Sequence, residues 1–349
     1  MRAAILHEAG PPENLVVSEI DTPEPGSGEV LVQVEACGVS SRDVVERNGT
    51  YKRDVTYPLI LGLEISGTVL ETGTGVPADL RPGDHVCSKA FSSCGHCRLC
   101  RTGRESTCFQ RKAVRGGYAE YVVLPWDALV VVPGDLPFAE TCSLGPAAGV
   151  ALNAVRDTAH VTIGETVLVS GAAGGVGLPA VQLAALSGAR VIALTREPAK
   201  ADALRGAGAA EVVQITQPDF SPAVRELTDG RGVDVVIDTV GSPVFAASFR
   251  SLAVHGRYAL VGQLNGGEVA INPARVFFKR ASLLGVGSVS RAQLTDVIDL
   301  AARGLLTARV DRTLPLDSVV EAHRAVESGS AVGRVVLTPH SLAADQIGR

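Results

Sequence analysis

Four cysteines fall within fifteen residues of this chain and are the clearest sign of chemistry in its sequence. Cys94, Cys97, Cys100 and Cys108 follow the spacing C-x2-C-x2-C-x7-C. Four thiolates on one short loop can surround Zn²⁺ as a tetrahedron and leave no open position for a reacting molecule. The loop has almost no apolar residues, so metal binding rather than burial would order it. We therefore predict one structural zinc ion at residues 94–108, whose negative charge would be offset by three arginines of the loop, Arg98, Arg101 and Arg104.

A second motif has the residues of a phosphate-binding turn. Residues 167–177 read VLVSGAAGGVG and lead into a helix expected over 178–187. Glycines let the backbone turn tightly and approach a pyrophosphate without a Cβ in the way, and the helix N-terminus offers free N–H groups. A strand before the turn and a second strand ending at Leu194 favour a dinucleotide site over a turn without a ligand. The residues expected at the phosphates are Ala172, Gly174, Gly175 and Val176.

The end of the second strand indicates which dinucleotide is bound. An NAD site usually has Asp or Glu about 20 residues after the glycines. Thr195 occupies that position here, so no negative charge would repel a 2′-phosphate, and Arg196 follows it. Lys200 adds a second cation, although Glu197 weakens the positive field and both cations could simply be solvated loop residues. The pattern favours NADP(H).

The two motifs lie in segments of different character. The first 125 residues contain short alternating runs, such as residues 29–34, separated by Gly/Pro turns, which is typical of β structure. From about Thr166, short apolar runs alternate with helix-length segments rich in Ala and Leu, which indicates a parallel sheet covered on both faces. The expected strands of that sheet include 167–169, 191–194, 233–237 and 258–261. After Gly287 we expect, in order, a helix near 295–303, polar turns, a closing strand at 334–337 and a loose tail.

Composition limits the class of protein. The chain has 349 residues, 46% hydrophobic and 20% charged, which predicts about two globular domains and excludes disorder. Its 32 basic and 37 acidic residues argue against a nucleic-acid partner. Charge interrupts the N-terminus before a signal peptide could form, and the uncharged stretch 167–189 contains five glycines, unlike a membrane span. The seven cysteines, odd in number and crowded, do not suggest a secreted disulfide framework. We expect a cytoplasmic protein without a membrane partner.

Together these features resemble the medium-chain dehydrogenase/reductase superfamily, which includes zinc alcohol dehydrogenases and quinone oxidoreductases. The resemblance covers essentially the whole chain and includes GLEISG at 62–67, GGYAEY at 116–121 and DTVG at 238–241. It implies an α/β protein with a Rossmann doubly wound parallel sheet at 149–286. A β-rich GroES-like catalytic domain would comprise 1–148 and 287–349, with the active site between the domains. The resemblance also implies a homodimer or homotetramer, and coenzyme contacts at Thr239, Val240, Val261, Gly262, Leu284 and Gly285.

Alcohol dehydrogenases of this superfamily hold a catalytic zinc at three positions, none of which carries a metal ligand here. These positions hold Ser40, Leu63 and Ala147, and Arg42 occupies the position of the proton-relay Ser or Thr. Without those ligands the chain cannot readily bind Zn²⁺ as a Lewis acid beside the reacting carbon. We therefore expect no catalytic zinc. An improvised metal site is the alternative, formed by Cys37, Cys142 and Glu64.

The loop around this lost site is similar to that of quinone oxidoreductases and related enoyl reductases. In the enoyl reductases, a Tyr eight residues after an Asp is the suspected proton donor, and here Tyr51 follows Asp43 at that distance. The resemblance implies that NADPH transfers hydride to the activated C=C bond of a small enone, quinone or enoyl-type substrate. Ser40 would donate a hydrogen bond to the developing negative charge, and Tyr51 or water would supply the proton. Asp43 is expected to fix the loop, and Glu64 to react or to pair with an arginine, for which Arg42 is the candidate.

Three other functions stay open. The chain could be an alcohol dehydrogenase with an unconventional catalytic zinc site, and its zinc content would then be near two ions per chain. It could reduce an imine or iminium, whose substrate brings its own positive charge and needs no metal. It could also be a non-catalytic NADPH-binding protein, which would bind NADPH and turn over neither enones nor alcohols.

Overall fold

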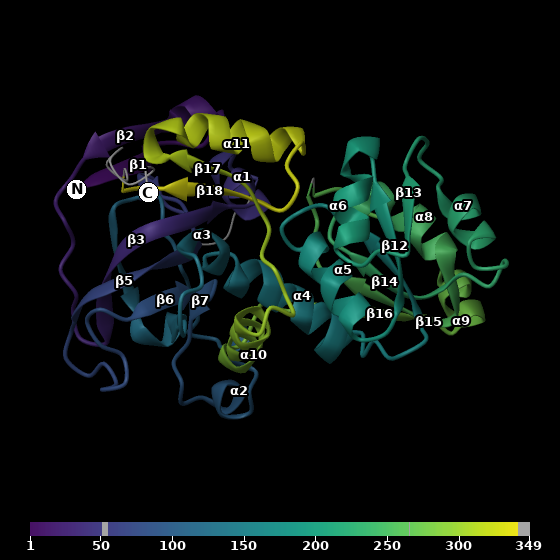
Figure 1. The fold of residues 1–349 in the computed structure, drawn as a ribbon, viewed down its shortest axis with the longest axis horizontal. Helices are drawn as coiled ribbons and strands as arrows, with labels where there is room; N and C mark the ends of the chain where they lie inside the picture. The colour runs from purple at the N-terminus through teal and green to yellow at the C-terminus, as the bar shows by residue number, and fades with distance from the viewer. Residues whose placement is uncertain (51–54, 265, 341–349) are drawn as a thin grey trace. The chain divides into compact units, whose positions relative to one another are not determined.

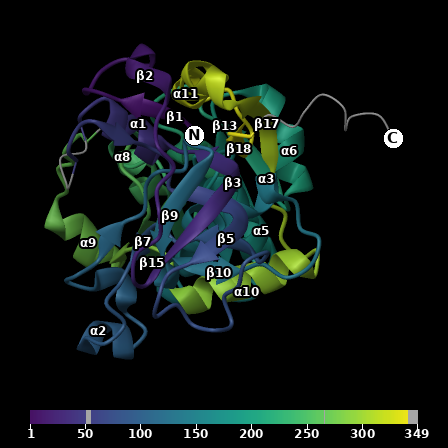
Figure 2. The ribbon, with the colours of Figure 1, turned by 90° about the vertical axis from the view of Figure 1, so that its left-hand side faces the viewer.

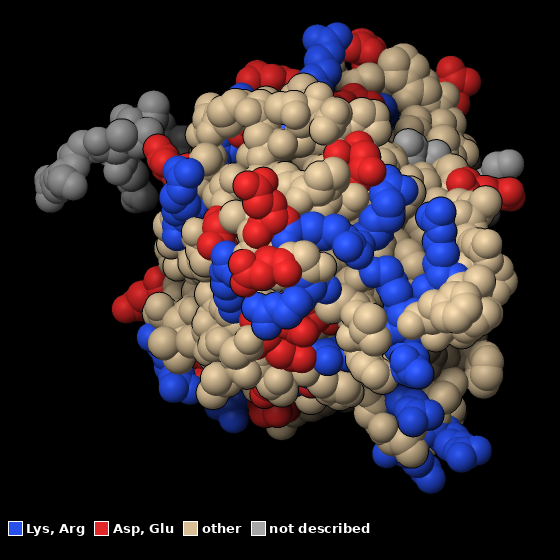
Figure 3. Space-filling view, turned by 90° about the vertical axis from the view of Figure 1, so that its right-hand side faces the viewer, with Lys and Arg blue, Asp and Glu red and all other residues tan. Residues whose placement is uncertain are grey.

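The computed structural model describes residues 1–50, 55–264 and 266–340, and the chain divides into two compact units (Figure 1). The catalytic unit consists of Met1–Pro146 and Val289–Arg349, and the nucleotide unit consists of Ala147–Ser288. The predicted α/β fold class is confirmed, because one unit is built on a parallel sheet and the other is rich in antiparallel strands. Basic and acidic side chains are interspersed over the middle of the face shown in Figure 3.

Six parallel strands form the sheet of the nucleotide unit, in the order β13-β12-β11-β14-β15-β16. The chain starts in the middle with β11, builds outward on one side and then returns to build the other side. This order is that of a doubly wound dinucleotide-binding sheet. The strands are β11 (Thr166–Ser170), β12 (Arg190–Thr195), β13 (Glu211–Gln214), β14 (Val233–Asp238), β15 (Leu252–Leu260) and β16 (Ser282–Gly285). The helices of this unit are α4 (Val150–Leu152), α5 (Gly177–Leu186), α6 (Ala201–Gly206), α7 (Ser221–Glu226), α8 (Ser242–Ser251) and α9 (Pro273–Lys279).

The uncharged stretch 167–189 folds as the sequence predicts, into β11, a glycine turn and α5. Both elements are largely buried, which explains why they lack charge. The apolar character of the stretch therefore reflects the inside of a sheet-and-helix layer. Across the described ranges, no helix combines the length and apolar character needed to cross a lipid bilayer.

Strand β3 (Glu29–Val39) is the centre of the catalytic unit, and Figure 2 shows it beside β5 and β9. It pairs antiparallel with β5 (Glu64–Thr72), β9 (Tyr121–Pro125) and β18 (Arg334–Thr338), so the two ends of the chain meet in one sheet. That sheet is completed by β6 (His85–Ser88), β10 (Leu129–Val131) and β17 (Val310–Pro315). The smaller sheets contain β1 (Arg2–Leu6), β2 (Leu15–Glu19) and β4 (Leu59–Ile60), and β7 (Phe91–Ser92) and β8 (Lys112–Ala113).

Residues 304–333 differ from the sequence-based expectation of polar turns, which is wrong. They contain β17 and the helix α11 (Val319–Ser328), and the expected helix near 295–303 is α10, which begins earlier (Arg291–Ala302). The buried face of α11 is mostly apolar, since Val319, Ala322 and Ala325 pack into the core of this unit, so an apolar stripe at helical spacing was present in the sequence and was overlooked. The other helices of this unit are α1 (Ser41–Arg47), α2 (Arg98–Arg101) and α3 (Phe138–Thr141).

A buried polar network joins α1 to α11. Arg47 donates to the carboxylate of Glu327 (Nη2–Oε1 2.5 Å) and to the Gly10 carbonyl oxygen (3.0 Å). Nδ1 of His323 lies 3.4 Å from Arg47 Nη1, and its Nε2 lies 3.2 Å from the hydroxyl of Tyr118. Burial, together with the neighbouring Arg47 cation, lowers the pKa of His323 to about 3. His323 is therefore neutral in the folded chain at neutral pH.

This lowered pKa predicts a loss of stability in acid. Below pH 6.5, His323 takes up a proton in the unfolded chain but stays neutral in the folded chain until the pH approaches 3. The free energy of unfolding should therefore fall by about 1.4 kcal/mol per pH unit from this residue, down toward pH 3. We expect His323→Gln to reduce the slope between pH 6 and pH 4 by about one proton. Urea unfolding, followed by the fluorescence of the single tryptophan Trp126 in the same unit, measures it.

His85 contributes a slope of the same sign, because burial lowers its pKa to about 4. The comparison between wild type and variant therefore matters more than the absolute slope. Identical slopes in the two proteins would contradict the assignment of a neutral His323.

Candidate functional site

The glycine-rich turn lies at the carboxyl edge of the parallel sheet, between β11 and α5. Gly171 has a φ of +59°, a conformation that residues with side chains rarely adopt. A Cβ on Gly177 would lie 2.1 Å from the Gly171 carbonyl oxygen, so only glycine allows α5 to start this close to the strand. A Cβ on Gly174 would approach only that same oxygen, at 3.3 Å. The turn is therefore closed toward the sheet and open at Gly174, as a pyrophosphate cradle must be.

All the strand-end residues predicted to contact the coenzyme lie at this same edge, because parallel strands end on one side of a sheet. The positions beside the turn are Ala172, Gly175 and Val176, and those at or just after strand ends are Thr195, Arg196, Thr239, Val240, Val261, Gly262, Leu284 and Gly285. The order of the strands reverses at β11, which lies between β12 and β14. In a doubly wound sheet, a ligand binds in the crevice at the point where the order reverses. These residues and the turn can together hold a dinucleotide.

Asp238 fixes the loop beside the glycine turn and was not predicted as a site residue. Its buried carboxylate accepts hydrogen bonds from the Ser170 hydroxyl (2.5 Å), the Tyr258 hydroxyl (2.7 Å) and the N–H groups of Val240 (2.9 Å) and Gly241 (3.0 Å). Thr239 adds a bond from its hydroxyl to the Ser170 carbonyl oxygen (2.8 Å). The DTVG motif at 238–241 therefore holds the start of the loop that follows β14 against the end of β11.

The loop after β12 has a positive balance of charge. The hydroxyl of Thr195 is occupied within the loop, since it accepts from the Glu197 N–H and donates to the Glu197 carbonyl oxygen, both at 3.1 Å. Lys200 is buried and its Nζ lies 3.3 Å from the Glu197 carboxylate, which it neutralises. Arg196 is exposed. The field at Arg196 is therefore that of a cation, without a carboxylate at the position that would repel a phosphate.

The four cysteines of the lobe converge on one point. Their sulfur atoms all lie within 4.8 Å of one another, and neighbouring pairs are 3.5 to 3.9 Å apart. A tetrahedron with Zn–S bonds of about 2.3 Å has S···S edges of about 3.8 Å, so the cluster fits a structural zinc ion.

Within the described ranges, the cysteine lobe is the one group of three or more potential ligands gathered this closely. Cys37, Cys142 and Glu64, the alternative metal site, do not form such a group. Both thiols are fully buried, and burial raises their pKa values well above the usual range.

Lys89 is a buried cation beside the lobe that sequence reasoning missed. Only 1% of it is exposed, and its Nζ lies 3.9 Å from the carboxylate of Asp127 and 4.0 Å from that of Glu105. The arginines proposed to offset the charge of the lobe are exposed instead. A lysine at the end of a β-strand carries no sequence signal that would separate it from an ordinary surface residue.

Ser40 and Asp43 form a capping box at the start of α1. The Ser40 hydroxyl and N–H both donate to Asp43 Oδ2, at 2.6 and 2.9 Å, and Asp43 Oδ1 accepts from the Gly62 N–H at 3.0 Å. Asp43 is therefore placed to fix the loop, in line with the prediction. The hydroxyl hydrogen of Ser40 points to Asp43, so Ser40 presents lone pairs rather than a donor to any other group. Tyr51 lies outside the described residues.

Glu64 pairs with Arg334, not with Arg42 as the sequence suggested. Both groups are buried, and Arg334 Nη2 lies 2.8 Å from Glu64 Oε1. A Cβ on Gly38 would lie only 2.4 Å from Glu64 Oε2, so the glycine leaves room for the carboxylate. Burial raises the pKa of Glu64 to about 7, against the lowering effect of Arg334. Arg42 instead donates to Glu46 (Nε–Oε1 2.5 Å). Arg334 lies 270 residues along the chain from Glu64, so only the pairing of β18 with β3 brings it there.

Two family models and several known proteins match this chain. Residues 26–134 match the family model of the alcohol dehydrogenase GroES-like domain, and residues 175–303 match that of zinc-binding dehydrogenases. The acryloyl-coenzyme A reductase of Sulfurisphaera tokodaii is 30% identical over 97% of this chain and 100% of its own.

Two solved structures are similar over nearly the whole chain. The crystal structure of AibC is 41% identical, covers 98% of this chain and 96% of its own, and has a TM-score of 0.90. An NAD-dependent alcohol dehydrogenase is 35% identical, with 97% and 100% coverage and a TM-score of 0.91. With both family models matched and these relatives aligned from end to end, the chain belongs to the medium-chain dehydrogenase/reductase superfamily and is one of its oxidoreductases.

Proposed function

We propose that this oxidoreductase uses NADPH to reduce a C=C bond conjugated to a carbonyl group, without a catalytic metal. The observation that carries the proposal is the buried Glu64–Arg334 ion pair. It neutralises the carboxylate of Glu64, which directly follows Leu63, one of the positions where the alcohol dehydrogenases have a zinc ligand. Two of those positions are buried and apolar, Leu63 and Ala147, and at the third Ser40 is engaged as a helix cap. The similarity to an acryloyl-coenzyme A reductase supports the same class of substrate.

When bound, NADPH supplies a hydride, here to the carbon β to the carbonyl group. The π electrons of the C=C bond move toward the carbonyl oxygen, and the α-carbon then takes a proton, so one NADPH and one proton are consumed per double bond. Tyr51 or water supplies that proton, and Tyr51 is the side chain that the sequence pattern favours. The Ser40–Asp43 capping box and the Asp43 bond to Gly62 hold the start of α1 in place.

This proposal predicts where the hydrogen goes. With NADPH deuterated at its reactive carbon and an α,β-unsaturated thioester, mass spectrometry and NMR should find one deuterium, on the β-carbon of the saturated product. Tyr51→Phe should lower kcat by about 10²–10⁴-fold, because a general acid is lost. Tyr121→Phe, on β9, is the matched control and should keep the wild-type rate. Turnover of alcohols in place of the unsaturated substrates would contradict the proposal.

Coenzyme preference is predicted to depend on Arg196. A hydrogen bond from an arginine to a phosphate is worth about 1.5–3 kcal/mol, so Arg196→Gln should lower kcat/KM for NADPH by about tenfold to a hundredfold. The value for NADH should change little, since NADH lacks the 2′-phosphate. Arg205→Gln, on the exposed face of α6, serves as the control. An equal fall with both coenzymes would show that Arg196 does not read the phosphate.

Zinc content distinguishes this function from that of an alcohol dehydrogenase with a second, catalytic ion. We expect about one zinc per chain by elemental analysis, and close to none in Cys100→Ser, because three thiolates hold the ion far less well than four. Cys87→Ala removes a buried thiol outside the lobe and should leave the zinc content unchanged. About two ions per chain in the wild type would support the alcohol dehydrogenase instead.

A further inference from the structure

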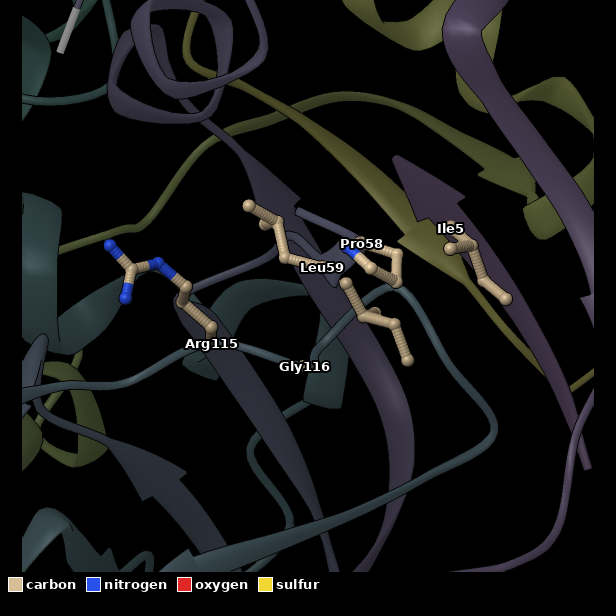
Figure 4. A pocket seen from close by; sticks show the side chains of 6 residues that line it. Ile5, Pro58, Leu59, Arg115 and Gly116 are labelled. Carbon is tan, nitrogen blue, oxygen red and sulfur yellow. The ribbon is translucent and has the colours of Figure 1, made fainter. Parts of the chain in front are cut away.

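A polar hollow of about 660 Å³ lies against the cysteine lobe (residues 94–108), and its lining includes Cys94 and Asp127. It differs from a hollow of about 430 Å³ on the same unit, which is lined mainly by aliphatic residues such as Leu59 and Ile60. In that second hollow the guanidinium of Arg115 is directed away from the aliphatic side chains (Figure 4). The polar hollow therefore marks a side on which the lobe meets the rest of the catalytic unit.

Glu105 is a charged residue of the lobe that is mostly buried. Its side chain is 13% exposed, whereas Arg98, Arg101 and Arg104 are exposed. Its Oε1 accepts a hydrogen bond from the Arg291 N–H at 2.6 Å. Arg291 is the first residue of α10, and the N–H groups of a first helical turn have no acceptor within the helix. Glu105 therefore supplies, from 186 residues away, the acceptor and the negative charge that favour the start of α10.

Lys89 holds Glu105 in this position. The buried ammonium group lies 4.0 Å from the carboxylate of Glu105 and 3.9 Å from that of Asp127. Asp127 in turn accepts from the N–H (2.6 Å) and the hydroxyl (3.0 Å) of Ser93, the residue before the first cysteine of the lobe. Burial lowers the pKa of Lys89, against the raising effect of the two carboxylates. Because a buried ammonium ion needs partners, Lys89 and these carboxylates keep one another in place.

Arg291 completes the cluster from the side of α10. Its guanidinium donates to the carbonyl oxygens of Asp127 (2.8 Å) and Trp126 (3.3 Å) and lies 5.6 Å from the centre of the Trp126 ring. With Lys89 and Glu105, the cluster contains two cations and two carboxylates. Its groups come from the lobe, from β6 and the chain just after it, from the segment 126–127 and from α10, so it joins the start of α10 to the lobe.

The position of Glu105 depends on the order of the lobe. Glu105 lies between two of the four predicted zinc ligands, Cys100 and Cys108, in a loop with almost no apolar residues to bury. Such a loop is ordered mainly by metal binding. The helix that Glu105 contacts begins just after the nucleotide unit, which ends at Ser288. The contact therefore lies where the chain returns to the catalytic unit.

We propose that zinc binding in the cysteine lobe fixes the start of α10 through Glu105, with Lys89 as a positioning residue. Loss of the metal releases Glu105, leaves the Arg291 N–H without its acceptor and takes one of two carboxylates away from Lys89. The lobe thus anchors the point at which the chain returns from the nucleotide unit. This role does not depend on which bond the enzyme reduces.

Hydrogen exchange of the Arg291 N–H in the full chain tests the coupling. Exchange, resolved to single residues by fragmentation in mass spectrometry, should be about tenfold to a hundredfold faster in Glu105→Ala, because a hydrogen bond to a charged group is lost. Removing zinc from the wild type with a chelator should give an increase of the same size, as should the zinc-free variant Cys100→Ser. Chelation should add little in Glu105→Ala. Glu71→Ala, which removes an exposed carboxylate of β5, should match the wild type with and without zinc.

Lys89→Met tests the positioning role. It removes the cation between Glu105 and Asp127 and keeps most of the buried volume. We expect faster exchange of the Arg291 N–H in the zinc-loaded variant, and faster release of zinc to a chromogenic chelator. Lys112→Met, which changes an exposed lysine of β8, is the matched control and should match the wild type in both measurements.

Three results would overturn the proposal. One is an unchanged exchange rate of the Arg291 N–H after zinc is removed from the wild type. A second is an effect of chelation that is as large in Glu105→Ala as in the wild type, since the metal would then act on α10 without Glu105. The third is an equal rise in exchange across all amides of the catalytic unit, which would show that zinc holds the whole unit rather than the start of one helix.

Discussion

The buried ion pair between Glu64 and Arg334 is the constraint on which the catalytic unit depends. It joins β5 and β18 across the end of β3, where the smallest side chain, at Gly38, makes room for the carboxylate. Removing one partner of such a pair leaves an uncompensated buried charge, at a cost of about 3–5 kcal/mol. Because β18 comes from the far end of the chain, this pair forms only where β18 joins the sheet beside β3.

Two further buried carboxylates, both on α1, also have their partners inside the unit. Asp43 holds the cap and Gly62, and Glu46 holds two arginines. In relatives with a catalytic zinc, a metal would be a strong local charge at this place. In the described part of this region, the buried carboxylates of Glu46 and Glu64 pair with arginines. These polar residues therefore position one another.

The sequence is most informative where backbone geometry demands a residue type. The spacing of the four cysteines and the glycines at 171, 174 and 177 have local causes, so the lobe and the turn could be predicted before the fold was known. The partner of Glu64, the buried Lys89 and the helix α11 depend on contacts between distant segments. Arg42 is nearer to Glu64 in sequence than Arg334 is, and choosing it was the natural error of reasoning without the sheet pairing.

This difference explains why the class of coenzyme is easier to predict from the sequence than the class of substrate. A dinucleotide is held by a turn and by strand ends that lie in sequence order along one sheet, so its contacts recur at predictable places. A substrate is held by whichever side chains the fold leaves with unused charge. On the catalytic unit such side chains cannot be picked out from the sequence, because the partners of Glu46 and Glu64 include Arg115 and Arg334, which come from distant segments.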